Sequence, residues 1–518
     1  MSNKKVRTRF APSPTGGLHL GGVRTVLFNY LFTKQNNGEF VLRIEDTDQT
    51  RFVEGAEAYI NETLAWCGLE PDESVEKGGA YGPYRQSERK AQGIYSQYAE
   101  QLIQKGFAYY AFDTPEELEK MRTEFKTESN PSPRYDAALR HKMRNSLSLS
   151  ADETDSLRKA GTPYVIRIKM PENETVSFTD MVRGEVTFNT SEVDDKVLLK
   201  ADGMPTYHLA VVVDDYLMKI SHAFRGEEWL PSAPVHVKLW EYLFGLEHMP
   251  RWAHLPLIMK PDGKGKLSKR DGDRLGFPVF AMNWTDPRTK EFTNGFRERG
   301  FLPEAFVNML ALLGWNDGTE QELFSLEELV QKFSTDRIHK GGAKFSYEKA
   351  LWFNQEWIKH SSADKLLPYV KNIISENDIA VNDDDKLLRV IELVKERCTL
   401  LTDFMVQAGF FFKTPENVDM SAVQPKWDAD KDAFFKALAT TYQQKASEDF
   451  TNEKLEHHFK ELASAKGIKA GELMLPLRIM LVGGKFGPHV FEIAEAIGAE
   501  ETIKRINNGL QSLSGNIE

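Results

Sequence analysis

A glycine-rich stretch near the N-terminus contains residue types that could bind a phosphate. RFAPSPTGGLHLGG, residues 9–22, passes through Gly16 and Gly21 into an amphipathic segment. Glycines at a strand-to-helix turn let the backbone approach a phosphate closely, and the helix N-terminus favours the anion. His19 lies inside this turn and could donate a hydrogen bond to a phosphate oxygen as charge develops on it. The stretch therefore predicts a phosphate-binding turn.

A second stretch, KGKLSKRDGD over 264–273, supplies positive charge. Lys266 and Lys269 lie in what we interpret as a Gly-rich loop, which could clamp a polyphosphate. Taken alone, a Gly-rich turn more often marks a chain reversal, and a Lys/Arg run is usually a solvated surface. The interpretation as a nucleotide site therefore depends on finding both.

The segments around the glycine turn predict a parallel, doubly wound sheet. We expect strands at 5–12 and from 39, where EFVLRIEDTD begins, with helices at 23–36 and 52–67. In such sheets the ligands lie at the carboxyl ends of the strands. KVLLKADGMPTYHLAVVVDD resumes the sheet, and its VVV run predicts a strand buried on both faces. The fold class is therefore α/β of the Rossmann type.

Two further regions differ in character from this sheet. The block 81–190 is an α/β insertion with an expected helix at 87–105, a capping box at Thr114 and Glu117, and a hairpin through Arg183–Gly184. From 301 onward, long amphipathic segments joined by short polar loops predict an all-helical C-terminal half.

The composition restricts the class of protein. The chain has 518 residues, a net charge of −11 and two cysteines, which fit a reducing compartment rather than a disulfide framework or a Cys-rich zinc site. The polar N-terminus is no signal peptide, and no apolar run is long enough to span a membrane. We expect a cytoplasmic protein without structural zinc. The negative charge argues against indiscriminate nucleic-acid binding, but leaves room for a local basic face.

The ordered motifs resemble those of a known family. HLGG after APSPTG, and KLSKR about 250 residues later, resemble the HIGH and KMSKS elements of class I aminoacyl-tRNA synthetases. RFAPSPTGGLHLG, LRIEDTD, GPYRQSER, PTYHLA, GEEWL and KLSKR together resemble bacterial glutamyl-tRNA synthetases. The helical C-terminal half resembles the anticodon-binding cage of those enzymes and not the β-barrels of glutaminyl-tRNA synthetases.

The resemblance implies a two-step ligation. ATP and L-glutamate would form glutamyl-adenylate, and the glutamyl group would pass to the terminal adenosine 2′-hydroxyl of tRNA(Glu), with release of pyrophosphate and AMP. Mg²⁺ would accompany ATP. The family pattern also implies a monomer and activation that depends on tRNA.

The resemblance also implies roles for individual residues. His19, Lys266 and Lys269 would be catalytic. The ATP site would consist of Gly16, His19, Gly21, Trp229, Lys266, Ser268 and Lys269, and the glutamate site of Arg9, Ser13, Glu45, Tyr207 and Arg225. Two arginines suit a side-chain carboxylate, and a carboxylate suits the α-ammonium. Val211 stands where the family commonly has Asn, so a polar contact near the substrate is missing or supplied elsewhere.

The same resemblance implies how the regions contact tRNA. Expected contacts are Arg51 and Arg85 with the acceptor stem and Arg397 with the anticodon. The expected regions are a Rossmann-type catalytic domain over 1–80 and 191–255, an acceptor-binding insertion over 81–190, a stem-contact region with the lysine loop over 256–338, and a helical anticodon-binding region of two subdomains over 339–518. The 276–296 segment looks like an insertion without an assigned function.

Two alternatives stay open at this point. One is a catalytically silent paralogue that binds tRNA as a regulator, against which the intact His19, Lys266 and Lys269 speak. The other is a small-molecule adenylyltransferase that shares the nucleotide turn, which would need neither the insertion nor the helical half. Whether tRNA(Gln) is also charged with glutamate cannot be read from the sequence.

Overall fold

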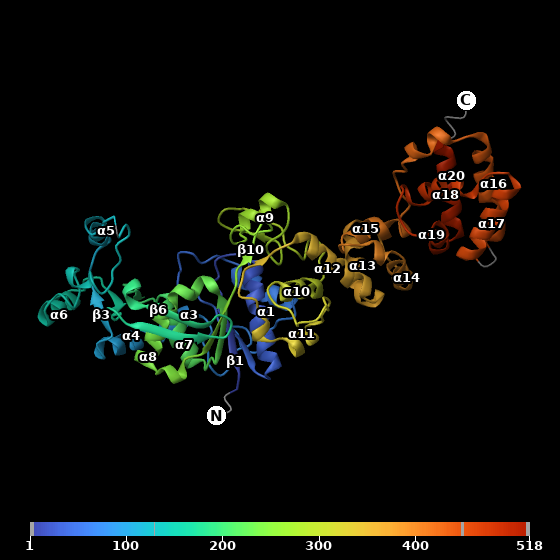
Figure 1. Ribbon diagram of the computed structural model, residues 1–518. Helices are drawn as coiled ribbons and strands as arrows, with labels where there is room; N and C mark the ends of the chain where they lie inside the picture. The colour runs from blue at the N-terminus through green and yellow to red at the C-terminus, as the bar shows by residue number, and fades with distance from the viewer. Residues whose placement is uncertain (1–4, 129, 447–449, 514–518) are drawn as a thin grey trace. The chain divides into compact units, whose positions relative to one another are not determined.

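The structure of the protein is a computed structural model that describes residues 5–128, 130–446 and 450–513 (Figure 1). The chain divides into two compact units. The first comprises the chain through Glu298 together with Phe306–Tyr347, and the second comprises Arg299–Ala305 together with the chain from Glu348.

The first unit is built on parallel strand pairs. β1 (Arg7–Phe10) pairs with β2 (Glu39–Leu42), and β8 (His222–Gly226) pairs with β9 (Arg251–Leu255), both in parallel register. β8 lies beside β1, where the Ser221 backbone N–H donates to the Arg7 carbonyl. α1 (Leu20–Gln35) connects β1 to β2 and packs against β1, β2 and β8. The predicted Rossmann-type parallel sheet is confirmed.

One predicted strand is a helix. The VVV run lies in α7 (Tyr207–Leu217), which is buried through its middle against α8 (Ala233–Leu243) and α4 (Ile94–Gln104). A short apolar run that is buried on all sides has no periodicity that separates a strand from a helix, and its β-branched residues favoured the wrong choice. The predicted 87–105 helix is likewise divided into α3 (Gln86–Ala91) and α4, because Gly93 between them adopts φ 73°.

The insertion contains a small antiparallel sheet and a hairpin. β4 (Val165–Ile168) lies between β3 (Ala108–Ala111) and β7 (Val197–Leu199). The predicted hairpin is confirmed as β5 (Thr175–Asp180) and β6 (Gly184–Asn189). The predicted capping box at Thr114 and Glu117 begins α5 (Pro115–Glu124). The other elements of the first unit are α2 (Ala56–Trp66), α5 (Pro115–Glu124), α6 (Ala151–Lys159), β10 (Ile258–Met259), α9 (Lys269–Leu275), β11 (Trp284–Thr285), β12 (Phe292–Thr293), α10 (Pro303–Leu312), α11 (Leu326–Lys332) and β13 (Ala343–Lys344).

The second unit is helical throughout its described residues, which confirms the predicted C-terminal half. Its apolar core contains buried residues of every helix from α12 (Tyr347–His360) to α20 (Ala499–Leu513). The helices are α12 (Tyr347–His360), α13 (Ala363–Glu376), α14 (Asp384–Val394), α15 (Asp403–Ala408), α16 (Ala429–Lys445), α17 (Asn452–Ala465), α18 (Ala470–Val482), α19 (Val490–Ile497) and α20 (Ala499–Leu513).

The 276–296 segment supports the glycine turn. The Leu20 backbone N–H donates to the Val279 carbonyl, so the first turn of α1 is bonded to this segment. A Cβ added to Gly17 would lie 3.0 Å from ring atoms of Phe280 and Trp284. The Tyr59 hydroxyl also donates to the Met282 carbonyl of this segment at 2.6 Å. The segment therefore packs directly beneath the turn that was predicted to bind phosphate.

A substitution at Gly295 tests this packing. A Cβ there would lie 2.0 Å from the Met282 carbonyl carbon, and backbone cannot rotate away as a side chain can. We expect Gly295→Ala to lower the free energy of unfolding of this unit by about 2–3 kcal/mol or more. Thermal unfolding followed by circular dichroism would measure it. Gly341→Ala is the control because its added Cβ would meet nothing within 4 Å; equal unfolding temperatures for the two variants would contradict the packing described.

Candidate active site

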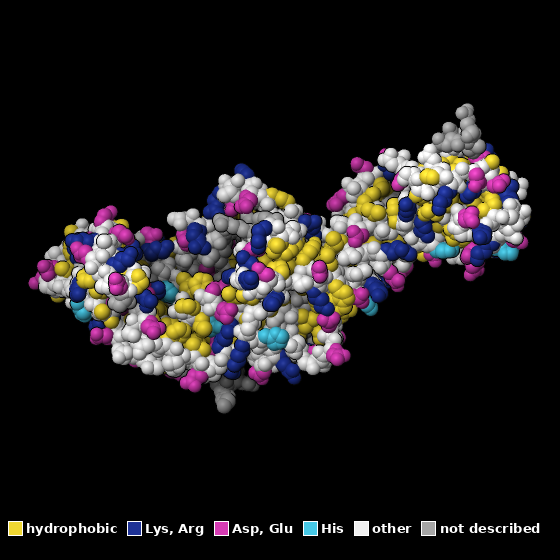
Figure 2. Space-filling view, turned by 45° about the horizontal axis from the view of Figure 1, so that its top comes forward, with side chains coloured by type: hydrophobic (Ala, Val, Ile, Leu, Met, Phe, Trp, Pro, Cys, Tyr) yellow, Lys and Arg dark blue, Asp and Glu magenta, His cyan; other side chains and the backbone are white. Residues whose placement is uncertain are grey.

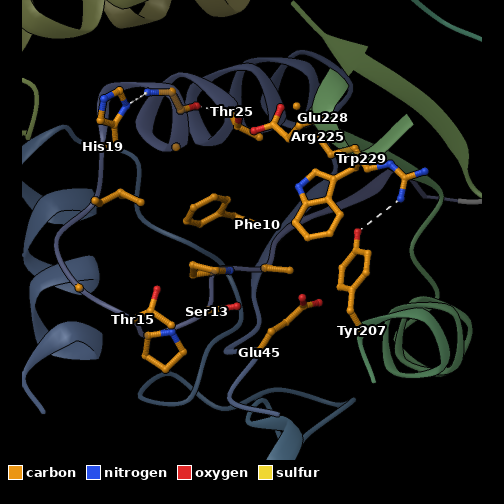
Figure 3. A pocket seen from close by; sticks show the side chains of 18 of the residues that line it. Phe10, Ser13, Thr15, His19, Thr25, Glu45, Tyr207, Arg225, Glu228 and Trp229 are labelled. Carbon is orange, nitrogen blue, oxygen red and sulfur yellow. Dashed lines mark hydrogen bonds between the residues drawn. The ribbon is translucent and has the colours of Figure 1, made fainter. Parts of the chain in front are cut away.

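A cavity of about 930 Å³ opens where the carboxyl end of β1 meets the N-terminus of α1 (Figure 3). His19 lies on one side, and Tyr207 and Arg225 lie together on the other. The cavity brings together twelve of the residues predicted from the sequence. They are Arg9, Ser13, Gly16, His19, Gly21, Glu45, Arg51, Tyr207, Arg225, Trp229, Lys266 and Ser268.

His19 caps the helix and keeps one ring nitrogen available. It is the N-cap of α1, and its Nδ1 accepts a hydrogen bond from the Gly21 backbone N–H at 3.2 Å. Nδ1 is therefore unprotonated, and Nε2 carries the proton of the neutral ring. Nε2 is buried and has no hydrogen-bond partner among the described residues. A buried donor without a partner is costly unless a ligand accepts from it, so the ring is suited to donate to a phosphate oxygen.

The pKa of His19 predicts how activity depends on pH. Burial, with a smaller contribution from the Lys266 ammonium, lowers this pKa to about 4. The ring is then neutral across the physiological range. Because kcat/KM reports the free enzyme, we expect kcat/KM for ATP to show no inflection from His19 between about pH 5.5 and 8. An inflection near the ordinary histidine pKa that disappears in a His19 variant would contradict this expectation.

The lysine segment forms the edge of the cavity. The Lys266 ammonium is exposed and lies 2.8 Å from Glu228 Oε1. The predicted loop ends at Ser268, which is the N-cap of α9 with Asp271 as its capping partner. Lys269 is the first residue of that helix, and its side chain lies outside the described part of the structure. Lys266 could exchange Glu228 for a phosphate, since a surface ion pair of this kind is weak.

The two predicted substrate arginines differ in their partners. Arg9 Nε donates to both carboxylate oxygens of Asp215, at 3.1 and 3.3 Å. Arg225 has no carboxylate within ion-pair distance among the described residues, and its buried Nη2 has no hydrogen-bond partner there. A buried guanidinium in this state is poised for an anionic ligand. Arg225 is therefore the stronger candidate for binding a substrate carboxylate.

The remaining predicted substrate residues line the same side. Glu45 accepts from Arg43 Nη2 at 3.0 Å, and burial raises the pKa of Glu45 despite this partner. The Tyr207 hydroxyl accepts from Arg225 Nη1 at 3.4 Å, and its ring packs on Trp229 with centroids 4.2 Å apart. Burial also raises the pKa of Tyr207. The site thus combines an anion at Glu45 with a cation at Arg225, which suits a zwitterion that carries an extra carboxylate.

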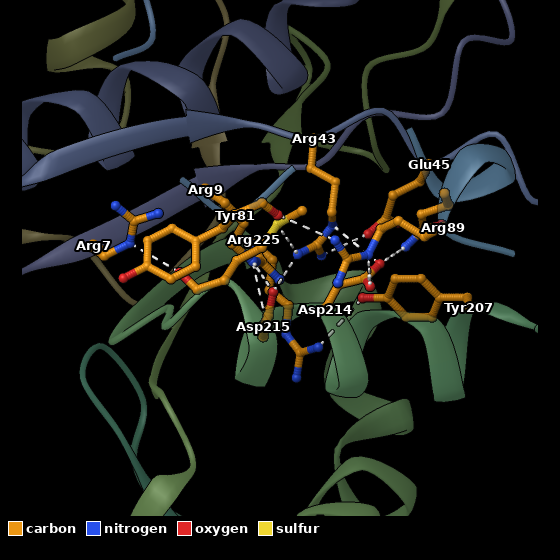
Figure 4. A network of polar contacts seen from close by, with 12 residues as sticks. Arg7, Arg9, Arg43, Glu45, Tyr81, Arg89, Tyr207, Asp214, Asp215 and Arg225 are labelled. Carbon is orange, nitrogen blue, oxygen red and sulfur yellow. Dashed lines mark hydrogen bonds and ion pairs between the residues drawn. The ribbon is translucent and has the colours of Figure 1, made fainter. Parts of the chain in front are cut away.

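A layer of charged residues behind the site was not predicted from the sequence (Figure 4). Asp215 accepts from both Arg9 and Arg43, whose guanidinium also donates to Glu45. Asp214, its neighbour on α7, accepts from Arg89 at 2.6 Å. The DD pair after the apolar run was visible, but its partners are more than 100 residues away in the sequence.

Val211 does not line the cavity. It is buried in the apolar core among α7, α8 and the insertion. Val211 therefore does not supply the polar contact with the substrate that the family pattern suggested at this position.

The three arginines predicted to contact tRNA do not share one site. Arg51 lines the cavity with an exposed side chain, 3.8 Å from Asp48. Arg85 lies outside the cavity and is paired with Glu57 and Glu88 at 2.9 and 2.7 Å. Arg397 is exposed in the second unit, near Arg478. Over the face drawn in Figure 2, basic and acidic side chains are interspersed.

Comparisons with known proteins agree with this arrangement. The model of the catalytic domain of class I tRNA synthetases (E and Q) matches residues 5–352, and that of an anticodon binding domain matches residues 361–510. A glutamate–tRNA ligase of Porphyromonas gingivalis is 50% identical over 99% of this chain and 100% of its own length, and one of Flavobacterium johnsoniae is 51% identical over 99% and 100%.

A solved structure shares the fold throughout. The crystal structure of a glutamate tRNA ligase from Elizabethkingia meningosepticum, in complex with its amino acid, superposes with a TM-score of 0.91 at 49% identity, covering 98% of this chain and all of that one. Similarity of this extent in both units, together with the two-sided cavity, shows that the chain belongs to the glutamate–tRNA ligases of the class I aminoacyl-tRNA synthetase family.

Proposed function

We propose that the protein ligates L-glutamate to tRNA(Glu) at the expense of ATP. The glutamate α-carboxylate attacks the α-phosphorus of ATP, pyrophosphate leaves, and the glutamyl group then passes from the adenylate to the 2′-hydroxyl of the terminal adenosine, with release of AMP. One observation carries the proposal: a single cavity holds a neutral histidine donor at a helix N-terminus and, opposite it, a buried guanidinium without a carboxylate.

The residues divide between the two substrates. We assign ATP to Gly16, His19, Gly21, Trp229, Lys266, Ser268 and Lys269, and glutamate to Arg9, Ser13, Glu45, Tyr207 and Arg225. His19, Lys266 and Lys269 act in catalysis by stabilising charge on the phosphates, since phosphoryl transfer asks the protein chiefly for positioning and electrostatics. Mg²⁺ would enter with ATP as part of that substrate and would neutralise charge on its phosphates.

The other regions contact the tRNA. We assign the insertion, 81–190, to the acceptor end with Arg51 and Arg85, the region 256–338 to the stem, and the helical region, 339–518, to the anticodon with Arg397. Arg85 must exchange a carboxylate partner for a phosphate to do so. We further propose a monomer in the cytoplasm that holds no structural zinc, because the insertion has no cysteine. The described residues include no helix long and apolar enough to cross a bilayer.

Pyrophosphate exchange tests the proposal. Glutamate, ATP and bulk tRNA together should support incorporation of labelled pyrophosphate into ATP, and omission of tRNA should reduce it. Absence of exchange with all three present would refute the function. Charging assays on purified tRNA(Glu) and tRNA(Gln) would then define which tRNA is the substrate.

A further inference from the structure

Arg225 is held differently from the other arginines around it. Arg7, Arg9, Arg43 and Arg89 all form ion pairs with carboxylates (Figure 4). Buried arginines are usually paired in this way, because an uncompensated charge is costly in a low-dielectric interior. Arg225 is also buried but lacks such a pair among the described residues. Two histidines contact its guanidinium instead.

The first support is His254 on β9. Arg225 Nε donates to His254 Nε2 at 2.9 Å. The other ring nitrogen, Nδ1, is 2.6 Å from Asp180 Oδ2 and donates to it. Asp180 also accepts from the backbone N–H groups of Val182 and Arg183, so it is fixed by its own hairpin. His254 is thereby oriented with its lone pair toward Arg225.

The second support is His236 on α8. Arg225 Nη1 lies 3.1 Å from His236 Nδ1, and His236 Nε2 lies 3.2 Å from His208 Nδ1. The guanidinium carbon lies 4.6 Å from the centroid of the Trp252 ring, which closes one face. Two imidazoles therefore take up two of the guanidinium N–H directions, while Nη2 is left without a partner.

A guanidinium can only donate hydrogen bonds, so both nitrogens that face it must carry lone pairs. His254 is then protonated on Nδ1 and His236 on Nε2, and one set of neutral tautomers satisfies every contact from Asp180 to His208. Burial lowers the pKa of both His254 and His236, which agrees with neutral rings.

Neutral histidine acceptors leave the positive charge of Arg225 in place, which carboxylate partners would not do. A carboxylate in place of either imidazole would hold the guanidinium equally well, but it would neutralise the charge and repel an incoming acid. We propose that His236 and His254 are positioning residues that orient Arg225 while leaving its positive charge uncompensated, and that this charge makes the site select an acidic side chain over its amide. The inference rests on the proposed function, since it takes glutamate to be the acid bound.

An isosteric pair of variants isolates the charge. Asn and Asp both place an oxygen near the position of His236 Nδ1, and they differ in charge. We expect His236→Asn to keep kcat/KM for glutamate within about fivefold of the parent, and His236→Asp to lower it by about tenfold to a hundredfold, with KM for ATP changed less than about twofold in both. The preference for glutamate over glutamine in tRNA-dependent pyrophosphate exchange should fall in His236→Asp alone.

A second pair covers the other imidazole and serves if His236→Asp does not fold. His254→Gln keeps an acceptor near Nε2, whereas His254→Leu removes it, and we expect KM for glutamate to rise by about tenfold or more only in the leucine variant. His222→Asn is the matched control, because His222 lies on β8 and faces Phe32 outside the cavity. Equal kcat/KM for glutamate within each pair would overturn the proposal, whereas a parent protein without glutamate-dependent exchange would refute the proposed function itself.

Discussion

Arg225→Gln is expected to abolish most glutamate activation while leaving the protein folded. The glutamine side chain removes a buried guanidinium that lines the cavity and has no carboxylate partner among the described residues, so the substrate carboxylate would lose the charge of Arg225. Loss of one member of a buried charge pair costs about 3–5 kcal/mol, which corresponds to a fall of about 10²- to 5 × 10³-fold in kcat/KM for glutamate. KM for ATP should change less than about threefold. Pyrophosphate exchange at varied glutamate and varied ATP measures both.

The thermal stability of Arg225→Gln should not fall along with its activity. An uncompensated buried charge destabilises the substrate-free protein, so removing it should leave the unfolding temperature unchanged or raise it, as is common for residues kept for function. Arg9→Gln offers the contrast, because Asp215 would lose one of its two arginine partners and the protein should become less stable. Arg251→Gln, an exposed change at the first residue of β9, is the control. A fall of less than about tenfold in kcat/KM for Arg225→Gln would show that another group binds the carboxylate.

The sequence predicted twelve of the residues that line the cavity. The glycine turn, the lysine segment and the strand ends lie within continuous motifs, and each motif carries its predicted site residue at a fixed offset. Because parallel strands present their carboxyl ends at one edge of a sheet, motifs far apart in the chain could be placed together before the structure was known. His19, Glu45, Arg225 and Lys266 accordingly line one cavity.

The residues that hold these groups in place could not be found in the same way. His236 and His254 contact Arg225 only because α8 returns beside β8 and β9 lies next to it, and a lone histidine in an apolar segment has no pattern that identifies its partner. The helix at Tyr207–Leu217 was missed for a related reason: its apolar residues are buried on every side, so tertiary packing decided its conformation. The support of the glycine turn by Phe280 and Trp284 also depends on contacts across more than 250 residues.

His19→Asn is expected to separate the two roles of His19. Asparagine is among the best N-cap residues, and its side-chain oxygen can accept from the Gly21 backbone N–H as Nδ1 of the imidazole does. It does not reach the position of Nε2. The variant should therefore keep its unfolding temperature and lose the donor that faces the phosphates. Removal of one preorganised donor to a developing charge costs about 10²- to 10³-fold in kcat, or about 2.7–4 kcal/mol.

His19→Ala is the comparison variant for His19→Asn. Alanine removes both the cap and the donor, so it should show the same loss of kcat together with a stability loss of about 1 kcal/mol, the typical cost of an N-cap. Single-turnover formation of the adenylate and thermal unfolding give the two quantities independently. If His19→Asn retained full activity, the unpartnered Nε2 would not be a phosphate donor, and the helix N-terminus with Lys266 would have to stabilise the phosphates alone. If both variants lost activity and stability together, His19 would act by holding the conformation of the glycine turn. Phe280 and Trp284, which pack against this turn, would then be part of the same support.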